Sequence, residues 1–339
     1  MVSSDGVGMV LYSTCPPFRG GNAKAYMRQV QEVARWSESG GCEGILVYTD
    51  NGLLDPWLLA QVIIQGTSSL CPLVAVQPVY MHPYTVAKMV ATLSLLYNRR
   101  IDLNIVAGGF KNDLLALGDQ TQHDRRYARL IEYTTVIQRL LQGGAVSFTG
   151  DFYQVANLRL TPALDPELLP RILLSGSSPE GLAAARALGA LPVRYPEPPS
   201  QNDGEAPNGD SVFGIRVGII GREEERDAWA IARERFPEDR RGQATHQLAM
   251  KVSDSAWHRQ LSSIAPSLGA DSTYWMVPFQ NYKTFCPYLV GSYPRVGEEI
   301  GRYVAAGCRA IILDVPPSLE EMLHMRLAVE AAEKTLVGR

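Results

Sequence analysis

Eight short runs of apolar and β-branched residues alternate with segments of helical periodicity along the chain. The runs lie at 7–13, 44–48, 72–77, 101–106, 171–175, 190–194, 212–220 and 309–315. In one of the segments between them, Val86, Met89, Val90 and Leu93 recur at the spacing of one helix face. Strands that alternate with helices form parallel sheets, and eight such units favour a closed (β/α)8 TIM barrel with its working residues at the carboxyl ends of the strands.

Three stretches interrupt this repeat. Residues 145–170 alternate in polarity around Gly150 and Asp151, which predicts an inserted β-hairpin. Residues 196–211 have turn composition where a helix is expected. Residues 237–291 form a long insertion before the last βα unit, and its aromatic part at 274–288 predicts a lid. We therefore predict one elaborated α/β domain over residues 1–339.

Charge and cysteine usage narrow the class of protein. The 32 Lys and Arg residues against 35 Asp and Glu give a net charge of −3, which argues against a nucleic-acid partner or a polybasic membrane contact. Apolar runs shorter than a bilayer span and an N-terminus without a signal-peptide pattern predict a cytoplasmic protein. The five cysteines and five histidines lack metal-type spacing, so we predict reduced thiols and no metal site.

The turn at Gly176, Ser177 and Ser178 joins the fifth predicted strand to a helix. Free N–H groups and hydroxyls at a helix N-terminus suit a phosphate group. A second interpretation is that Ser177 and Glu180 form a capping box, which would satisfy the same N–H groups within the chain. The residues alone leave both interpretations open.

Two further polar residues stand near predicted strand ends. Asn104 lies inside an otherwise apolar strand, and an unpaired buried amide costs about 1–3 kcal/mol, so a ligand with many heteroatoms could supply its partners. His123 stands beside Asp124 at a predicted helix start, and the residues alone favour this structural explanation over a ligand contact. His82, before Pro83, is also explained as a helix-start residue.

Six short motifs follow one another in a fixed order. They are His82-Pro-x-x-Val-Ala, Asp102-Leu-Asn-Ile-Val-x-Gly-Gly, His123-Asp-x-Arg-Tyr127, Gly176-Ser-Ser-Pro, Phe213-Gly-Ile-Arg216 and Leu289-Val-Gly291. Their order and spacing resemble the bacterial-luciferase-like (LLM class) flavin-dependent monooxygenases, and within them the alkanesulfonate monooxygenase branch. The resemblance extends from near residue 9 to near residue 325.

This resemblance implies a TIM barrel that binds reduced FMN (FMNH2) delivered by a separate NAD(P)H:flavin reductase. It implies oxygenation of a small-molecule substrate with O2 through a C4a-hydroperoxyflavin, in a homodimer or homotetramer. The cofactor-binding residues that it implies are Asn104, Ala107, Gly108, His123, Tyr127, Gly176, Ser177 and Ser178. Among these, Ser177 and Ser178 would hold the phosphate.

The substrate side departs from the sulfonate enzymes. Their loop cysteine, strand-seven histidine and strand-eight tyrosine align with Leu53, Gly218 and Val315, whereas Arg216 is retained. We therefore expect a small or carrier-bound metabolite rather than a simple alkanesulfonate.

Arg216, together with His123, is predicted to be catalytic. Its planar guanidinium suits an anion anchor, or a partner for Asp50 or Asp314. The predicted substrate and lid residues are Asp50, Trp57, Tyr282 and Lys283.

Three other functions stay open at this point. Luciferase-like barrels include F420-dependent oxidoreductases, and the replaced positions also fit a non-catalytic flavin-binding relative. A barrel that acts as a phosphate-ester lyase or isomerase would use a helix N-terminus for phosphate as well. That class needs a buried lysine or paired carboxylates at strand ends, which the predicted strand ends do not offer apart from Asp50 and Asp314.

Overall fold

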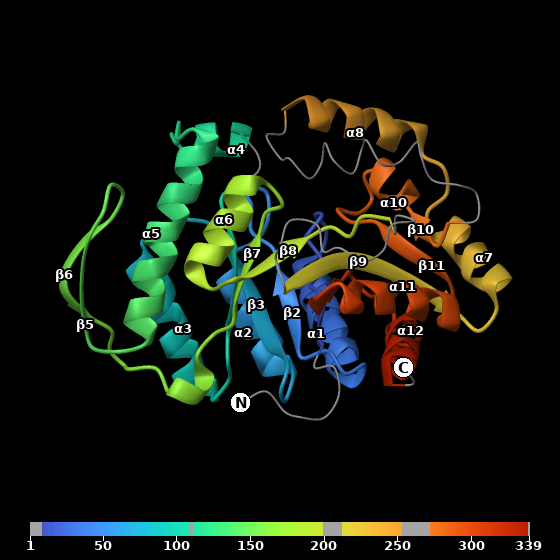
Figure 1. Ribbon diagram of the computed structural model, residues 1–339, viewed down its shortest axis with the longest axis horizontal. Coiled ribbons are helices and arrows are strands. Elements are labelled where there is room, and N and C mark those ends of the chain that lie inside the picture. Colours follow the sequence, from blue (N-terminus) through green and yellow to red (C-terminus); the bar gives the residue numbers. More distant parts are fainter. Residues whose placement is uncertain (1–8, 109–110, 199–211, 253–271, 338–339) are drawn as a thin grey trace. The chain divides into compact units, whose positions relative to one another are not determined.

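The protein is described here by a computed structural model that covers residues 9–108, 111–198, 212–252 and 272–337. The strand order of its main sheet is β10-β11-β9-β12-β1-β2-β3-β4-β7-β8, and β8 pairs with β9 as well. All eight predicted strands are present, as β1, β2, β3, β4, β7, β8, β9 and β12, with ends that differ by a few residues from those predicted. The fold is the predicted (β/α)8 barrel (Figure 1).

Internal contacts divide the chain into two compact units. Unit 1 comprises Met1–Thr14, Trp36–Glu43 and Val193–Arg339, and unit 2 comprises Cys15–Arg35 and Gly44–Pro192. Helix α1 (Ala23–Ser39) contributes residues to both. Each unit is described separately below.

Unit 2 holds four parallel strands and the helices that cover them. The strands are β2 (Gly44–Val47), β3 (Cys71–Val76), β4 (Asp102–Val106) and β7 (Ile172–Ser175). The helices are α2 (Pro56–Gly66), α3 (Pro83–Tyr97), α4 (Lys111–Ala116), α5 (His123–Leu141) and α6 (Pro179–Leu188). In Figure 1, α3 and α5 run side by side along this unit, and their apolar faces enter one core with β3 and β4.

The helix starts in unit 2 follow local sequence signals. Asp55 caps α2 and His82 caps α3, and each is followed by proline at the first helical position, where no N–H is needed. The Nδ1 atom of His82 accepts the N–H of Tyr84 at 3.1 Å. His82 is therefore a helix-start residue, in agreement with the sequence prediction.

The predicted hairpin is confirmed as β5 (Ala145–Thr149) and β6 (Gln154–Arg159), which pair antiparallel. Glu132 of α5 fixes its turn, because the carboxylate accepts backbone N–H groups of Asp151, Phe152 and Tyr153 at 2.8, 2.8 and 3.1 Å. A 3₁₀ turn, η1 (Pro166–Leu168), completes the insertion before β7.

Unit 1 holds the remaining barrel strands. They are β1 (Val10–Thr14), β9 (Phe213–Arg222), β12 (Cys308–Leu313) and the second half of β8 (Leu191–Arg194), whose first two residues belong to unit 2. The strand β9 pairs in parallel with β8 and β12, and β12 pairs in parallel with β1. Its other helices are α7 (Glu225–Arg235), α8 (Arg240–Val252), α11 (Tyr293–Ala305) and α12 (Leu319–Val337). The helix α12 packs against both β9 and α11.

The insertion in unit 1 contains two strands that the sequence did not predict, β10 (Tyr274–Trp275) and β11 (Tyr288–Ser292), and a short helix, α10 (Val277–Gln280). The strand β9 is ten residues long, so Phe213 to Val217 pair with β12 while Gly218 to Arg222 pair with β11. The apolar stretch that forms β11 is so short that its periodicity does not distinguish a strand from a loop. Most of the 196–211 insertion, and residues 253–271 of the third, lie outside the described residues.

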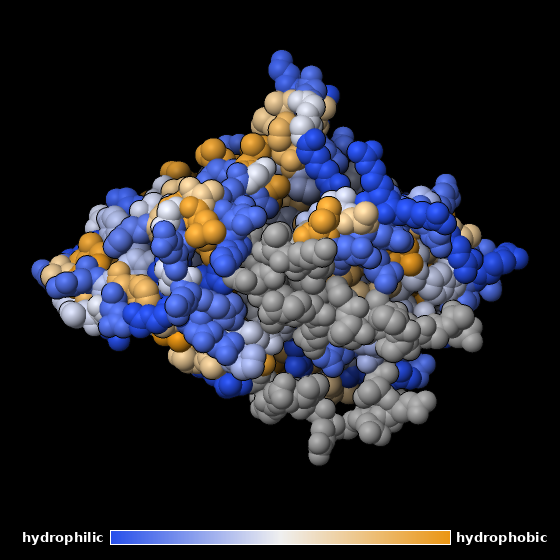
Figure 2. All heavy atoms as spheres, turned by 90° about the horizontal axis from the view of Figure 1, so that it is seen from above, coloured by the Kyte–Doolittle hydropathy of each residue, from blue (hydrophilic) through white to orange (hydrophobic). Residues whose placement is uncertain are grey.

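The surface carries scattered apolar side chains. Hydrophobic residues form separate patches among hydrophilic ones on the face shown in Figure 2. Exposed leucines of unit 2 include Leu58 on α2 and Leu95 and Leu96 on α3. Within the described part of the chain, no helix combines the length and apolarity needed to cross a bilayer. The homodimer or homotetramer stays a prediction.

One carboxylate ties α12 to the rest of unit 1. Glu321 pairs with Arg222 of β9 and with Arg235 of α7, whose Nη2 lies 2.7 Å from Oε2. Burial alone would raise the pKa of Glu321, but the two guanidinium groups lower it below its ordinary value. Three elements therefore depend on one charge.

We expect Glu321→Gln to lower the free energy of unfolding by ~3 kcal/mol, because it leaves two partly buried guanidinium groups without their counterion. The neighbouring Glu320, whose side chain is 84% exposed, provides the matched control Glu320→Gln. A carboxylate with a lowered pKa stabilises the fold above its unfolded pKa of about 4.3 and loses this effect as the pH falls through the folded value. The difference between wild type and Glu321→Gln in urea unfolding should therefore shrink below about pH 4; equal stability of the two Gln variants at neutral pH would contradict the assignment.

Candidate active site

The turn after β7 is built around one tyrosine hydroxyl. Tyr127 of α5 is 9% exposed. A Cβ added at Gly176 would lie 2.9 Å from its hydroxyl oxygen, and one added at Gly181 would lie 3.2 Å from it. Burial raises the pKa of Tyr127, so it keeps its proton, although a hydrogen bond with Ser178 and the positive charge of Arg126 oppose this shift. The backbone at the start of α6 thus approaches the hydroxyl as closely as glycine allows.

The two serines of this turn have different roles. Ser178 is the N-cap of α6, and its Oγ accepts the N–H of Gly181 at 3.1 Å. The capping box predicted for Ser177 and Glu180 is therefore wrong by one residue. The Oγ of Ser177 is buried and has no hydrogen-bond partner among the described residues. A buried hydroxyl without a partner is costly, so a ligand atom at this place would satisfy it.

Asn104 lies on β4 next to this turn. It is 4% exposed, and its Oδ1 accepts a hydrogen bond from Ser175 Oγ at 2.9 Å. The sequence predicted that a ligand could supply hydrogen-bond partners for Asn104. For the Oδ1 atom, Ser175 of β7 supplies the partner instead. Ala107 and Gly108 follow β4 directly, and Gly108 has φ +92°, which favours glycine. A Cβ there would also lie 3.0 Å from Leu114.

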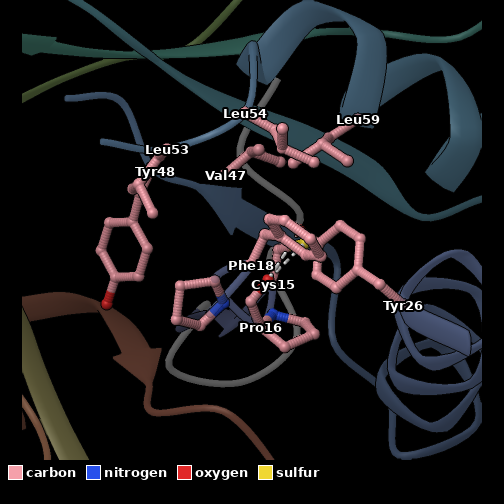
Figure 3. Close-up of a pocket in the computed structure, with 10 residues that line it drawn as sticks. Cys15, Pro16, Phe18, Tyr26, Val47, Tyr48, Leu53, Leu54 and Leu59 are labelled. Atoms are coloured by element: carbon pink, nitrogen blue, oxygen red, sulfur yellow. Dashed lines mark hydrogen bonds between the residues drawn. The ribbon is translucent and has the colours of Figure 1, made fainter. Parts of the chain in front are cut away.

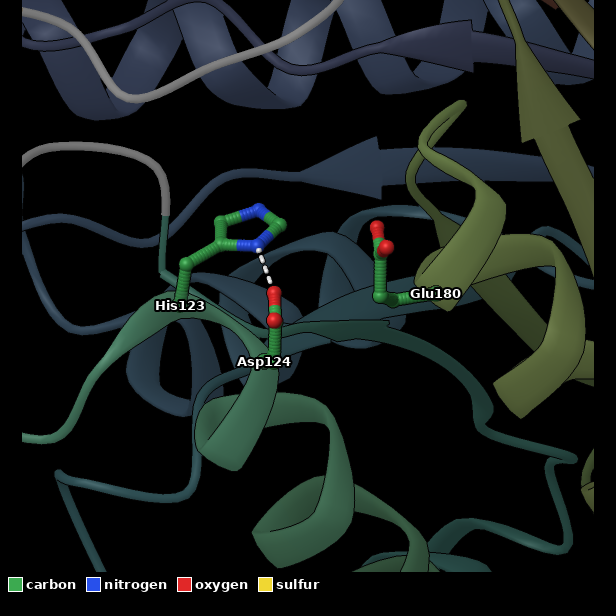
Figure 4. Close-up of side chains that lie close together, drawn as sticks. All are labelled: His123, Asp124 and Glu180. Carbon is green, nitrogen blue, oxygen red and sulfur yellow. Dashed lines mark hydrogen bonds and ion pairs between the residues drawn. The ribbon is translucent and has the colours of Figure 1, made fainter.

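His123 is the first residue of α5, and its ring meets the Tyr127 ring edge-on at 5.3 Å. Its Nδ1 lies 2.9 Å from the Asp124 carboxylate, as Figure 4 shows. Glu180 of α6 completes a group whose ligand atoms lie within 4.8 Å of one another. Exposed acidic groups often cluster without a metal, so this proximity assigns no metal site. The structure does bring His123 and Tyr127 together with the Ser177 turn.

An open, mostly apolar hollow lies elsewhere in unit 2, after β1 and β2 (Figure 3). Its volume is about 220 Å³, including the part open to solvent. Leu53 is one of the residues that line it. Cys15 also lines it, but burial raises the pKa of its thiol to about 12. Cys15 therefore does not supply a thiolate near neutral pH.

Two predicted substrate residues lie in the segment after β2. Asp50 shapes the turn, because its Oδ1 accepts the N–H of Gly52 at 2.6 Å, and its charge raises the pKa of Asp113 in addition to the effect of burial. Trp57 is 2% exposed and packs in the core with α3 and β3. The Trp57 indole thus has a structural role in this core, and its part in substrate binding stays a prediction.

Unit 1 contains a second buried polar cluster, around Arg216 of β9. Arg216 is 7% exposed, and so is Asp314, which follows β12 directly. The Tyr288 hydroxyl of β11 donates to Asp314 Oδ2 at 2.8 Å. A Cβ at Gly218 would overlap the Tyr288 ring, so the ring occupies the space above this glycine.

The charges of Asp314 and Arg216 both act on the thiol of Cys286. Its thiol is fully buried, which raises its pKa; Asp314 raises the pKa further, whereas Arg216 lowers it. Tyr288 and Cys286 were not among the predicted site residues. The sequence feature that could have indicated Tyr288 is Gly218, because a glycine inside a strand often marks the close approach of another group.

The other two predicted substrate residues lie in the aromatic segment of unit 1. Lys283 forms an ion pair with Asp239, with Nζ 2.8 Å from Oδ2, and Asp239 also accepts the N–H of Gly242 at the start of α8. Tyr282 has φ +56° and packs edge-on against His246 and Phe285. Both residues have structural roles within unit 1, and their part in substrate binding stays a prediction.

Comparison with known proteins gives the family. The family model described as "Luciferase-like monooxygenase" matches residues 9–310. The chain is also 37% identical over 309 residues to the 4-(gamma-L-glutamylamino)butanoyl-[BtrI acyl-carrier protein] monooxygenase BtrO of Niallia circulans. That match covers 89% of this chain and 90% of the relative.

Solved structures share the fold at low sequence identity. EDTA monooxygenase from Chelativorans sp. BNC1 superposes with a TM-score of 0.71 at 15% identity, over 96% of this chain and 94% of that one. An F420-dependent secondary alcohol dehydrogenase superposes with a TM-score of 0.65 at 17% identity, over 95% and 98%. The family description and the 37% identical relative both indicate an enzyme. The chain belongs to the luciferase-like monooxygenase family.

Proposed function

We propose that the protein is a two-component monooxygenase that uses reduced FMN and O2 to oxygenate an acyl group held on a carrier protein. The observation that carries the cofactor part is the buried Ser177 Oγ, which has no hydrogen-bond partner among the described residues and lies at the start of α6. A separate NAD(P)H:flavin reductase would supply the reduced flavin. The sequence contains no G-x-G-x-x-G dinucleotide motif, which agrees with this division of labour.

The residues of unit 2 fit the phosphate end of the cofactor. Ser177 Oγ would donate to a phosphate oxygen, and the N-terminus of α6 would favour its negative charge. The Ser178 and Tyr127 side chains form a hydrogen bond with each other beside this place. The glycines at 176 and 181 keep this hydroxyl against the backbone of the turn. Asn104, Ala107, Gly108 and His123 would flank the ring system.

Reduced flavin, when bound, supplies two electrons and activates O2 so that one oxygen atom reaches the substrate. The tasks of this chain are to bind and orient the flavin, to position the substrate and to exclude water. Arg216 would orient the substrate through its fixed guanidinium fork. Apolar side chains such as Leu53 in the hollow of unit 2 would keep bulk water from an apolar part of the substrate.

The substrate class follows from the relative and from the altered positions. BtrO is named for its action on an acyl group attached to an acyl-carrier protein, and the match spans nearly all of both chains. The residues that align with polar groups of sulfonate enzymes are Leu53, Gly218 and Val315 in this chain. These differences favour an acyl substrate over an alkanesulfonate.

A second candidate is an F420-dependent oxidoreductase. The observation in its favour is the shared fold with an F420-dependent alcohol dehydrogenase. Titration with reduced FMN and with F420 distinguishes the two, and flavin binding without substrate-stimulated oxygen consumption would indicate a non-catalytic relative.

The two serines of the turn can be separated experimentally. We expect Ser177→Ala to weaken binding of reduced FMN by about 1–3 kcal/mol with an unchanged melting temperature, because it removes a hydrogen bond to a charged group. Ser178→Ala should instead lower the free energy of unfolding by about 1 kcal/mol, because it removes the cap of α6. Anaerobic flavin titration and thermal melts measure both; unchanged affinity in Ser177→Ala would place the phosphate elsewhere.

The carrier requirement can be tested with matched substrates. We expect oxygen consumption coupled to product when the reductase, FMN and an acyl group loaded on a carrier protein are present. The free acid should react at least about tenfold more slowly, since binding energy from the carrier contributes to orientation. Mass spectrometry of the acyl group should show a gain of one oxygen atom. Equal rates for carrier-bound and free acids would rule out the carrier.

Arg216 provides a test of the substrate side. We expect Arg216→Ala to lose most turnover while its affinity for reduced FMN stays near that of wild type. Arg216→Lys should restore little, because a point charge does not reproduce a bidentate fork. If Arg216 were only a buried structural charge, its removal would instead cost ~3–5 kcal/mol of stability, which a thermal melt would reveal.

A further inference from the structure

The cluster around Arg216 contains an anion as well as a cation. Leu313 pairs with Val217 in the parallel ladder of β12 and β9, so the next residue, Asp314, is level with Gly218. Ile312 pairs with Arg216. Because side chains alternate along strands, Arg216, Gly218, Ile312 and Asp314 belong to one face of this pair. Asp314 thus stands two residues beyond Ile312, the residue of β12 that pairs with Arg216.

The opposite face of β9 is covered by a helix. A Cβ at Gly221 would lie 3.2 Å from Ala328 of α12, which shows that Gly221 faces this helix. Alternation then directs Arg216 and Gly218 away from α12. The charged pair therefore lies on the face of β9 and β12 that points away from α12, and Asp314 stands at the carboxyl end of β12, the end of the strands at which TIM-barrel enzymes bind their substrates.

Tyr288 holds Asp314 in place. Its ring occupies the space above Gly218 and meets the Phe236 ring edge-on at 5.1 Å. From this position the hydroxyl donates to Asp314 Oδ2 at 2.8 Å. Burial first, and then the negative charge of Asp314, raise the pKa of Tyr288, so the phenol stays protonated and donates. A hydrogen bond from a neutral donor stabilises the carboxylate in its charged form.

We propose that the Arg216 end of unit 1 recognises a neutral carbonyl group of the substrate, a thioester or an amide, and discriminates against sulfonates and other anions, because Asp314 offsets the charge of Arg216. The N–H groups of a guanidinium still donate to a neutral carbonyl. An anion that approaches the same guanidinium is also repelled by the carboxylate. The opposite effects of Arg216 and Asp314 on the buried Cys286 thiol support this balance.

This inference rests on the proposed function and names the group that the enzyme reads in its substrate. Asp314 and Tyr288 are positioning residues, since they act through Arg216. In this arrangement, Gly218 determines specificity, because any side chain there would displace the Tyr288 ring.

The test compares binding of two probes of equal chain length to the full-length protein, butanoyl pantetheine as a neutral thioester and butanesulfonate as an anion. Wild type should bind the thioester at least about tenfold more tightly than the sulfonate, a difference of about 1.4 kcal/mol. Asp314→Asn should strengthen sulfonate binding by about tenfold, because the repelling charge is gone. The thioester affinity should change by less than about threefold. Tyr288→Phe keeps the ring above Gly218 and should shift the ratio in the same direction by a smaller amount.

Asp227→Asn is the matched control, since it removes one acidic charge from an exposed position on α7. It should leave both affinities unchanged. A wild-type preference for sulfonate, binding of neither probe, or an unchanged ratio in Asp314→Asn would overturn the proposal. If Asp314→Asn fails to fold in a thermal melt, an unchanged ratio in Tyr288→Phe overturns it. Binding of both probes is measured by isothermal titration calorimetry, which needs neither flavin nor oxygen. These outcomes are therefore distinct from a failure of flavin binding or oxygen consumption, which would overturn the proposed function.

Discussion

A parallel strand needs cover on both faces and a helix to carry the chain back, and this requirement shapes both units. In unit 2 it places the start of a helix close behind each strand, so that Ser177 and Ser178 follow β7 while Ala107 and Gly108 follow β4. In unit 1 it places Asp314 directly after β12. Polar residues at the carboxyl ends of these strands do not disturb the packing of the core. The candidate site residues lie there for that reason.

The turn after β7 shows how adjacent identical residues can do different work. Ser178 accepts a backbone N–H of the first turn of α6, and the helix needs this cap whether or not a ligand is bound. Ser177 makes no such contact among the described residues, although its hydroxyl is buried. Tyr127 from α5 closes the turn against two glycines. These contacts hold the turn in place without a ligand, which would reduce the entropy lost when the proposed cofactor binds.

In unit 1, a glycine of β9 and a tyrosine of β11 form one structural feature. Gly218 has no side chain, and the space above it is filled by the Tyr288 ring, whose hydroxyl donates to Asp314. The polar atoms next to Gly218 therefore come from Tyr288 and Asp314. The two charges of Arg216 and Asp314 can orient a polar group while the cluster stays close to neutral, which suits a buried setting.

The sequence by itself determined the eight barrel strands, the hairpin near Gly150 and the residues around the β7 turn, because these depend on local periodicity and on short turn signals. It could not separate the roles of Ser177 and Ser178, since an N-cap shifted by one residue gives almost the same pattern. It also gave no sign that the Trp57 indole packs in the core with α3 and β3. The contact of Tyr288 with Gly218 and Asp314 joins residues far apart in the chain, and only the tertiary structure, through the pairing of β9 with β11 and β12, decided it.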